Sequence, residues 1–363
     1  MIALFVSVEA AMANFLGDGD NSWTGTGGAD VTFGEGGADH LEGLAGDDTL
    51  DGGSGDDTLE GNGGNDVLAG GDGVDILFGH AGDDFLRPGA VLASEVLFGY
   101  GGTDIVDWGS ITGASWVINL GKNQAVANGS VFQSIASIEG VITGDGNDSI
   151  IGSKAANDIT SGHGNDTVKA GLGDDVVTDY GGSNWLVLGD GNDRASLGGG
   201  VSFVEGGEGD DSVWASSGDD TVKGGAGADT LRGYTGFDIL QGGKGADRIS
   251  GEGGADFLFG GGGADTFVIT DWNDSTPFAT DMIDDWDGAD VLDLSGIDAR
   301  MDRAGNEAFR VVDAFTGSSG QLVIRYDAAE DITIVEGDVG GDGVADLRVE
   351  IFFDVRDILD IVL

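Results

Sequence analysis

The sequence predicts an all-β protein: a parallel β-roll (β-solenoid) of glycine-rich nonapeptide repeats, followed by a C-terminal β-rich cap. The repeats form either one continuous roll or two rolls, and the interruption between the two blocks favours two. The first observation is a nine-residue unit, G-G-x-G-x-D-x-U-x with U apolar, of which residues 52–60 are a clean copy. The second is composition, because glycine supplies 72 of 363 residues and proline only 2, without the three-residue period of collagen. The third is phase: the eighth position stays apolar in nearly every unit, which a disordered tract would not maintain.

The repeats divide the chain into five predicted segments. We expect a short N-terminal cap segment, a first roll, a spacer that breaks the period, a second roll, and a C-terminal domain. Their boundaries are residues 1–15, 16–107, 108–142, 143–268 and 269–363.

Each unit is expected to contribute a minimal strand and a tight turn. In the x-U-x triplet, U points inward and its neighbours point outward, because side chains alternate along a strand. The preceding G-G-x-G-x-D stretch must turn the chain, and glycine tolerates positive φ there. Stacked coils would place equivalent strands about 4.8 Å apart.

The same stacking places equivalent aspartates close together. Two carboxylates at that spacing repel by roughly 1 kcal/mol in water, and by several times more at an effective dielectric near 20. A column of them therefore favours cations between the turns, and calcium accepts both carboxylate and carbonyl oxygens. The candidate calcium ligands are Asp30, Asp39, Asp48, Asp57, Asp66, Asp75, Asp84, Asp104, Asp148, Asp166, Asp175, Asp193, Asp211, Asp220, Asp229, Asp238, Asp247, Asp256 and Asp265.

Four units lack this aspartate. Asn21, Asn157, Asn184 and Ser202 stand at the sixth position, and Ala195 replaces a larger core residue between the last two. We expect weak calcium binding, or none, between Asn184 and Ser202.

Metal binding is also expected to drive folding. One buried U side chain contributes about 1.5–3 kcal/mol per unit, whereas ordering nine residues costs about 1–2 kcal/mol each in backbone entropy. Calcium would supply the difference, so we expect a disordered chain without calcium and a β-roll with it.

Composition excludes several functions. Lys+Arg total 15 against 66 Asp+Glu, a net charge of −51, which disfavours nucleic acid and anionic membrane surfaces as partners. No cysteine is present, and no apolar run reaches the length of a transmembrane segment. Residues 1–9 are apolar but lack the basic start of a signal peptide, so a strand or helix capping the first coil is favoured.

The nonapeptides of residues 16–268 resemble the repeats-in-toxin, or hemolysin-type, calcium-binding family. This resemblance implies two nonapeptides per coil. It also implies that calcium is shared between turns on one side, ligated by the sixth-position aspartates and by carbonyls of the glycine turns.

The tail is similar to the C-terminal domain of serralysin-type secreted metalloproteases. That resemblance implies a domain that caps the roll, a C-terminal signal for the type I secretion machinery, and an extracellular location. A terminal strand packed into the cap is compatible with the signal. The matching stretches are residues 281–286, 290–298, 307–309, 337–346 and 360–363.

Catalytic signals are weak. His40, His80 and His163 lie in separate repeats without the H-E-x-x-H zinc motif, and no G-x-S-x-G elbow occurs. Paired carboxylates recur in nearly every unit, which favours structural calcium sites over a glycosidase pair. Only 15 residues precede the repeats, so we expect no N-terminal catalytic domain.

Two further signals have ordinary explanations. Residues 338–346 resemble an EF-hand loop but lack its twelfth-position glutamate, so an acidic hairpin turn is favoured. Outward aromatics could bind a sugar or a partner, although coverage by the spacer, the cap or a dimer mate is favoured. These aromatics are Phe33, Phe78, Trp214 and Phe259.

The sequence therefore predicts a secreted, non-enzymatic calcium-binding repeat protein with a structural or interaction role. One alternative is the non-catalytic scaffold of a serralysin-, lipase- or alginate-epimerase-related secreted enzyme. Another is a calcium-dependent surface or matrix adhesin, for which cell-surface polysaccharide is the candidate partner.

Overall fold

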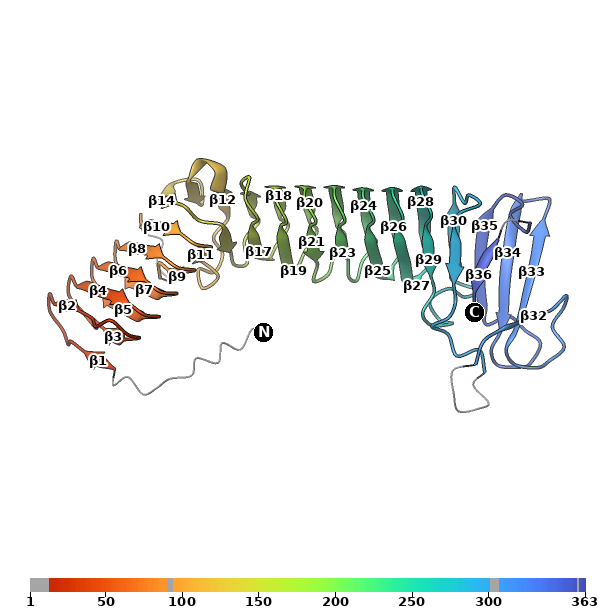
Figure 1. The fold of residues 1–363 in the computed structure, drawn as a ribbon, viewed down its shortest axis with the longest axis horizontal. Helices are drawn as coiled ribbons and strands as arrows, with labels where there is room; N and C mark the ends of the chain where they lie inside the picture. Colours follow the sequence, from red (N-terminus) through yellow and green to blue (C-terminus); the bar gives the residue numbers. More distant parts are fainter. Residues whose placement is uncertain (1–12, 90–93, 301–306, 358) are drawn as a thin grey trace. The chain divides into compact units, whose positions relative to one another are not determined.

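The computed structural model describes residues 13–89, 94–300, 307–357 and 359–363. The strand or helix expected within residues 1–9 lies outside them. The described residues are all-β apart from one 3-10 turn, η1 (Leu120–Lys122), which confirms the predicted fold class (Figure 1). The chain forms two compact units, residues 1–168 and 169–363, and β18 (Thr167–Leu172) lies at the passage between them.

The first unit contains two sheets of mainly parallel strands. Successive units of the repeat alternate between the sheets, so each sheet receives one strand per coil. Sheet A comprises β1 (Asn14–Phe15), β3 (Val31–Phe33), β5 (Thr49–Ser54), β7 (Val67–Asp72), β9 (Phe85–Arg87), β11 (Ile105–Asp107), β15 (Gly140–Ile142) and β17 (Asp158–His163). Sheet B comprises β2 (Ser22–Thr24), β4 (His40–Ala45), β6 (Thr58–Gly63), β8 (Ile76–Ala81), β10 (Val96–Gly101), β14 (Val131–Ala136), β13 (Gln124–Ala127), β12 (Trp116–Asn119) and β16 (Ser149–Ile151).

The strand register repeats every 18 residues, two nonapeptides per coil. Leu59 of β6 pairs with Leu41 of β4 on one side and with Leu77 of β8 on the other. All three side chains are fully buried. The eighth position is therefore the core ladder, as its apolar phase predicts.

The spacer takes part in the stacking of the first unit. β15 pairs in parallel with both β11 and β17, while β14 pairs with β10. Antiparallel β13 connects β14 to β12, which pairs with β16. The buried indoles of Trp108 and Trp116 stack with their centroids 4.5 Å apart and fill the core at this point.

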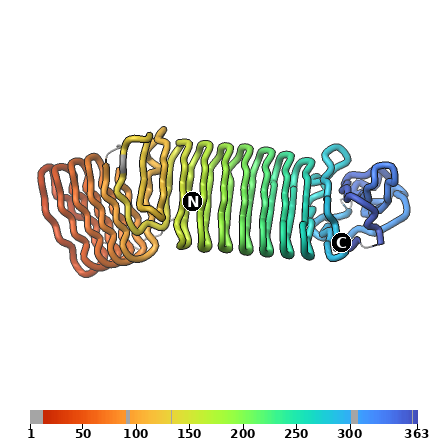
Figure 2. The backbone as a smooth tube through the Cα atoms, turned by 90° about the horizontal axis from the view of Figure 1, so that it is seen from above, coloured from red at the N-terminus to blue at the C-terminus, as the bar shows by residue number. Residues whose placement is uncertain are grey.

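The second unit repeats the arrangement and adds the C-terminal region. Its coils follow one another as similar loops in Figure 2. Sheet A comprises β19 (Val176–Gly181), β21 (Arg194–Ser196), β23 (Ser212–Trp214), β25 (Thr230–Gly236), β27 (Arg248–Gly254), β29 (Thr266–Val268), β31 (Val291–Asp293) and β36 (Asp360–Val362). Sheet B comprises β20 (Trp185–Asp190), β22 (Phe203–Glu208), β24 (Thr221–Ala226), β26 (Ile239–Lys244), β28 (Phe257–Gly262), β30 (Asp281–Asp284), β35 (Leu347–Phe352), β34 (Ile332–Asp338), β33 (Gln321–Asp327) and β32 (Arg310–Val311).

The C-terminal region continues both sheets before covering their ends. β30 pairs with β28, and β31 with β29, which adds strands beyond the last nonapeptide. Sheet B then continues through β35, which pairs in parallel with β30, to antiparallel β34 and β33, and it ends in β32, which pairs in parallel with β33. β36, at the C-terminus, pairs in parallel with β31, so the last residues form the expected terminal strand.

Many strands are longer than the expected x-U-x triplet. β22 and β24, for example, pair at Phe203↔Thr221 and continue to Gly207↔Gly225 and Glu208↔Ala226. The second and third residues of the following unit thus stay paired in the ladder, which leaves a shorter turn. The five segment boundaries drawn from the sequence stay predictions.

Core leucines should dominate stability. Leu68 is fully buried and pairs with Leu50, so Leu68→Ala should lower the free energy of unfolding by about 2–5 kcal/mol. The measurement is urea denaturation at fixed, saturating calcium. Val74→Ala is the control: Val74 is 48% exposed, so the change should stay within about 0.5 kcal/mol. Equal effects of the two substitutions would contradict the assigned core.

Candidate metal centres

The sixth-position aspartates form hydrogen-bonded columns. The backbone N–H of Asp39 donates to Asp57 Oδ1 over 2.7 Å, and that of Asp57 donates to Asp75 Oδ1 over 2.9 Å. In the second unit, Asp229 accepts from Asp211 and donates to Asp247, both at 2.8 Å. Each carboxylate therefore uses one oxygen to fix the coil before it.

The second carboxylate oxygen, Oδ2, is buried without a hydrogen-bond partner among the described residues at most of these aspartates. A buried polar oxygen without a partner is costly and points to a missing ligand. Those with a glycine five residues earlier are Asp39, Asp48, Asp57, Asp66, Asp75, Asp84, Asp104, Asp211, Asp229, Asp238, Asp247 and Asp256.

The glycine at the first position keeps space open beside this oxygen. A Cβ built at Gly52 would overlap Asp57 Oδ2 and lie 2.7 Å from the carbonyl oxygen of Gly70 in the next coil. The same cradle occurs at Gly242, between Asp247 Oδ2 and the Gly260 carbonyl. One carboxylate oxygen and one carbonyl oxygen of the adjacent turn therefore converge on a point that only glycine leaves empty.

This donor set fits calcium. Within the described parts of the chain, no group of three or more His, Asp or Glu side chains could hold a metal by themselves. A cation here must combine carboxylate with backbone carbonyl oxygens, as calcium does. Zinc, which prefers nitrogen and sulfur ligands in tetrahedral sites, does not suit this set.

Five of the sequence-predicted ligands lack the glycine cradle. A side chain at the first position places its own Cβ where the space would be. These ligands, with their first-position residues, are Asp148 (Thr143), Asp166 (Ser161), Asp175 (Ala170), Asp193 (Leu188) and Asp220 (Ala215).

The residue at the second position of a unit separates two kinds of turn. In open turns, Oδ2 of the column aspartate has no hydrogen-bond partner among the described residues. In closed turns, a residue of the same turn donates a hydrogen bond to it. The second-position residue of an open turn has positive φ, for example Gly53 at 98° and Asn62 at 74°. In the turn of Asp30, the second residue is Thr26, whose N–H and hydroxyl both donate to Asp30 Oδ2, at 2.7 and 3.0 Å. The Ser216 N–H similarly donates to Asp220 Oδ2. A β-branched or hydroxyl residue here satisfies the carboxylate internally.

Several column members could not be identified from the nine-residue period. Glu95 accepts from the Asp75 N–H, and its own N–H donates to Gln133 Oε1. Glu139 accepts from Asp104 at 3.1 Å. Glu95 and Glu139 each precede a core residue by two positions, as the sixth-position aspartates do, and this was the sequence signal that could have identified them. Insertions obscure it, because they change the spacing between successive column residues from 18 to 20 or more.

The columns also continue into the C-terminal region. Asp281 Oδ1 accepts from the Asp256 N–H at 3.1 Å, and Asp290 Oδ1 from the Asp265 N–H at 3.0 Å. Asp281 is fully buried, and its Oδ2 and that of Asp256 have no hydrogen-bond partner among the described residues. Asp274 lies near enough to raise the pKa of both carboxyls.

Burial raises the pKa of the column carboxyls. It is the largest cause at Asp84, Asp211 and Asp238, each of which has a pKa of about 7 instead of the ordinary 3.8. The neighbouring column carboxylates raise it further, whereas the N–H bond from the preceding coil lowers it. Without a cation, these acids therefore bind protons at a higher pH in the folded roll than in the unfolded chain.

A second ladder of hydrogen bonds could not be predicted from the repeat pattern, because its residues stand at the fifth position, which the pattern leaves variable. The fifth-position Asp47 accepts from the N–H of Asn65, whose Oδ1 accepts from Asp83, each bond being 2.9 Å. Asp210 accepts from Ala228 in the same way. Recurrent Asp and Asn at this position were the signal. These bonds run in the opposite direction to those of the sixth position and join the coils without a cation.

The remaining candidates have structural roles. In the 338–346 loop, Asp338 accepts from the Gly341 and Gly343 N–H groups and Asp346 from those of Val339 and Gly340, which confirms the acidic hairpin. His40 and His80 each place Nε2 3.8 Å from a Glu60 carboxylate oxygen.

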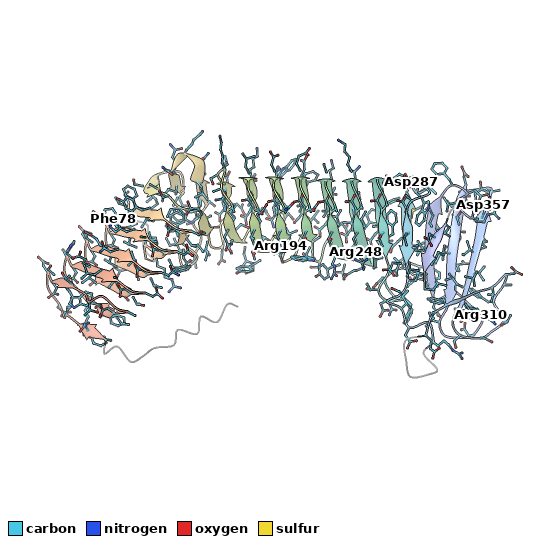
Figure 3. All side chains as sticks on the ribbon, in the orientation of Figure 1. Phe78, Arg194, Arg248, Asp287, Arg310 and Asp357 are labelled. Carbon is cyan, nitrogen blue, oxygen red and sulfur yellow. The ribbon has the colours of Figure 1, made fainter. Side chains whose placement is uncertain are left out.

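Two of the outward aromatics are covered in part by neighbouring rings. Phe33 stacks on Phe15 at 5.0 Å, and Phe78 lies 5.8 Å from Phe98. Phe78 is labelled in Figure 3.

Acid should partly replace calcium. The folded pKa values of about 7 lie above the ordinary 3.8, so the folded roll binds more protons than the unfolded chain between about pH 4 and 7. Stability of the metal-free roll should then fall as pH rises through this window. Circular dichroism in EDTA should show more β-structure at pH 5 than at pH 8. Replacing Asp84, Asp211 and Asp238 together by Asn should flatten this dependence, and an unchanged profile would contradict the assignment.

The cradle can be opened or filled by single substitutions. Thr26→Gly should release Asp30 Oδ2 beside Gly25 and the Gly43 carbonyl, raising the calcium stoichiometry by about one. Gly52→Ala should lower it by about one, because the new Cβ fills the cradle of Asp57. Equilibrium dialysis counts the ions, and Thr24→Gly, two residues before Thr26, is the matched control. Equal stoichiometry in all variants would refute the cradle.

Comparisons with known proteins agree with this geometry. The family model for the C-terminal domain of peptidase M10, serralysin, matches residues 94–363. The model of the RTX calcium-binding nonapeptide repeat matches residues 17–50, 24–59 and 51–86. Both families are non-catalytic parts of proteins, and both are typical of proteins exported by type I systems. No curated protein matches the chain.

Solved structures of similar repeats come from Azotobacter vinelandii. The AlgE6R3 subunit of its mannuronan C5-epimerase is 28% identical, with 42% of this chain and 78% of that chain covered and a TM-score of 0.24. The AlgE6R2 subunit is 24% identical, with 41% and 90% covered and a TM-score of 0.25. With the serralysin model matching most of its length and RTX repeats before it, the chain belongs to the serralysin C-terminal family and carries RTX repeats, a family of repeats that binds Ca²⁺.

Proposed function

We propose that this chain is a secreted protein that binds Ca²⁺ through its aspartate columns and folds on binding it after type I export. The observation that carries the proposal is the buried, unpartnered Oδ2 of the twelve column aspartates that follow a first-position glycine, each of which faces a glycine cradle such as the one between Asp57 and the Gly70 carbonyl. A calcium ion in each open cradle would be coordinated by both oxygens and would neutralise the negative charge of the column.

The proposed ligands follow from the cradle. Those with an open glycine turn are the twelve aspartates named above, which combine an unpartnered Oδ2 with a first-position glycine, together with Asp265, which follows Gly260. The turns of Asp30 and Asp220 are proposed to stay metal-free because Thr26 and Ser216 donate to their carboxylates. The stretch from Asn184 to Ser202, where the Asn184 N–H meets a serine hydroxyl in place of a carboxylate, is proposed to be metal-free as well.

Calcium availability would direct the export. Extracellular calcium modules have dissociation constants of about 10⁻⁴–10⁻³ M, so their sites are empty in the cytosol and filled outside. The unfolded chain could then pass the type I machinery, for which residues 360–363 are the proposed signal. Pairing of β36 with β31 after folding is compatible with that role.

A structural or interaction role is proposed in place of catalysis. Among the described residues no helix has the length and apolar character to cross a membrane. The column aspartates accept backbone hydrogen bonds from the neighbouring coils, and His40 and His80 lie 3.8 Å from Glu60. The scaffold of a secreted enzyme whose catalytic part lies elsewhere is the alternative, and a hydrolytic or epimerase activity that co-purifies with the chain would favour it.

A calcium titration tests the proposal. An EDTA-treated sample should change from coil to β-structure and become compact near millimolar calcium, as followed by far-UV circular dichroism and hydrodynamic radius. Magnesium at equal ionic strength should not replace it, because it demands a smaller octahedral site. A compact, β-rich chain at pH 8 in EDTA would show that the columns do not drive folding.

A further inference from the structure

The second unit contains a groove beside one of its closed turns. Its volume is about 500 Å³, and it lies where β21, β23 and β25 pass into the turns that follow them. The middle turn is that of Asp220, in which Ala215 replaces the first glycine and Ser216 binds the carboxylate. The groove therefore lies beside a turn of the column that is proposed to bind no cation.

The walls of this groove differ chemically from the rest of the chain. Although 66 of 363 residues are acidic, no acidic residue lines it. Two aromatic side chains, Trp214 and Tyr234, are combined with the hydroxyl groups of Ser196, Ser216 and Thr235. Tyr234 remains 38% exposed.

Two guanidinium groups lie beside Trp214, next to the residues that line the groove. Arg194 lies over the Trp214 ring at 5.9 Å and forms no ion pair among the described residues. Arg232 is the register partner of Trp214 in the next strand, and its nearest carboxylate, on Glu252, is 4.0 Å away. Figure 3 shows Arg194 on the same side of the second unit as Arg248. Positive charge is scarce in this chain, with 15 Lys and Arg residues, so its position here is informative.

This combination suits a sugar chain that carries carboxylates. An indole presents a flat apolar face with a polar edge, against which a pyranose ring can pack. Serine and threonine hydroxyls can donate to and accept from sugar hydroxyls, and a guanidinium fork matches a carboxylate. Because the groove crosses three coils spaced about 4.8 Å apart, an extended polymer along the roll axis would meet wall residues at each coil.

We propose that this groove binds a linear polysaccharide bearing carboxylate groups, held by Trp214 and Arg194. An acidic polymer would be repelled by the chain's charge of −51 unless calcium neutralises the columns. Binding should therefore require the calcium-loaded form. To that extent the site depends on the proposed calcium-driven folding, which circular dichroism tests separately on each sample.

The test is titration of the full, calcium-loaded chain with tetragalacturonate and, in parallel, with neutral cellotetraose. The carboxylated sugar should bind at least tenfold more tightly than the neutral one. Trp214→Ala should weaken its binding at least tenfold. Arg194→Gln should weaken it by a similar factor while leaving the affinity for cellotetraose unchanged.

Phe259→Ala is the matched control, because Phe259 is an outward aromatic of sheet B away from the groove, and it should bind as the parent does. Absence of binding at millimolar sugar by a chain that folds with calcium would overturn the site, as would equal affinity for the two sugars. Parental affinity in Arg194→Gln would also overturn it, and this variant keeps the test valid if Trp214→Ala does not fold. A parent chain that stays unfolded in calcium would instead refute the proposed function.

Discussion

Close approach of buried carboxylates is the interaction on which the rest of the roll depends. Each coil places an aspartate next to its equivalents in the coils before and after, with Oδ1 fixed by a backbone N–H and Oδ2 left inward. At an effective dielectric near 20, neighbouring charges at coil spacing repel by about 3–4 kcal/mol. Long columns of this kind are compatible with folding only when protons or cations neutralise them. Burial, with a smaller contribution from nearby carboxylates, raises the pKa of Asp57 and Asp75 to about 6.

Glycine serves the column in a more specific way than by easing a turn. At the first position it leaves open the point where the carboxylate and the carbonyl of the next coil converge; at the second, positive φ keeps the backbone N–H away from Oδ2. Leu44 and His80 adopt positive φ without being glycine, which shows that conformation matters more than residue type there. Thr26 does not adopt it, and its turn closes on the carboxylate.

The nine-residue period was sufficient to predict the core and the aspartate columns. Within a block of repeats this period does not change, and two nonapeptides always make one coil. The period could not identify Glu95, Asp281 or Asp290, whose roles depend on insertions that change the spacing to 20 or 25 residues while the coil length in space stays fixed. It also treated Asp193 like Asp57, because the difference lies in the neighbour five residues earlier. Strand length was underestimated, since ladder bonds through glycine leave no side-chain pattern.

The same constraint explains where the roll is free to vary. A turn with a neutral or internally satisfied sixth position needs no cation, and its remaining positions are released from the glycine requirement. In the second unit, such turns carry Leu197 and Ala215 at the first position, where open turns carry glycine, and Ser216 at the second. The groove with Trp214 lies beside them. Loss of a metal site from a column can therefore supply the side chains from which a binding surface is built, while the fifth-position ladder and the leucine core still hold the coils in register.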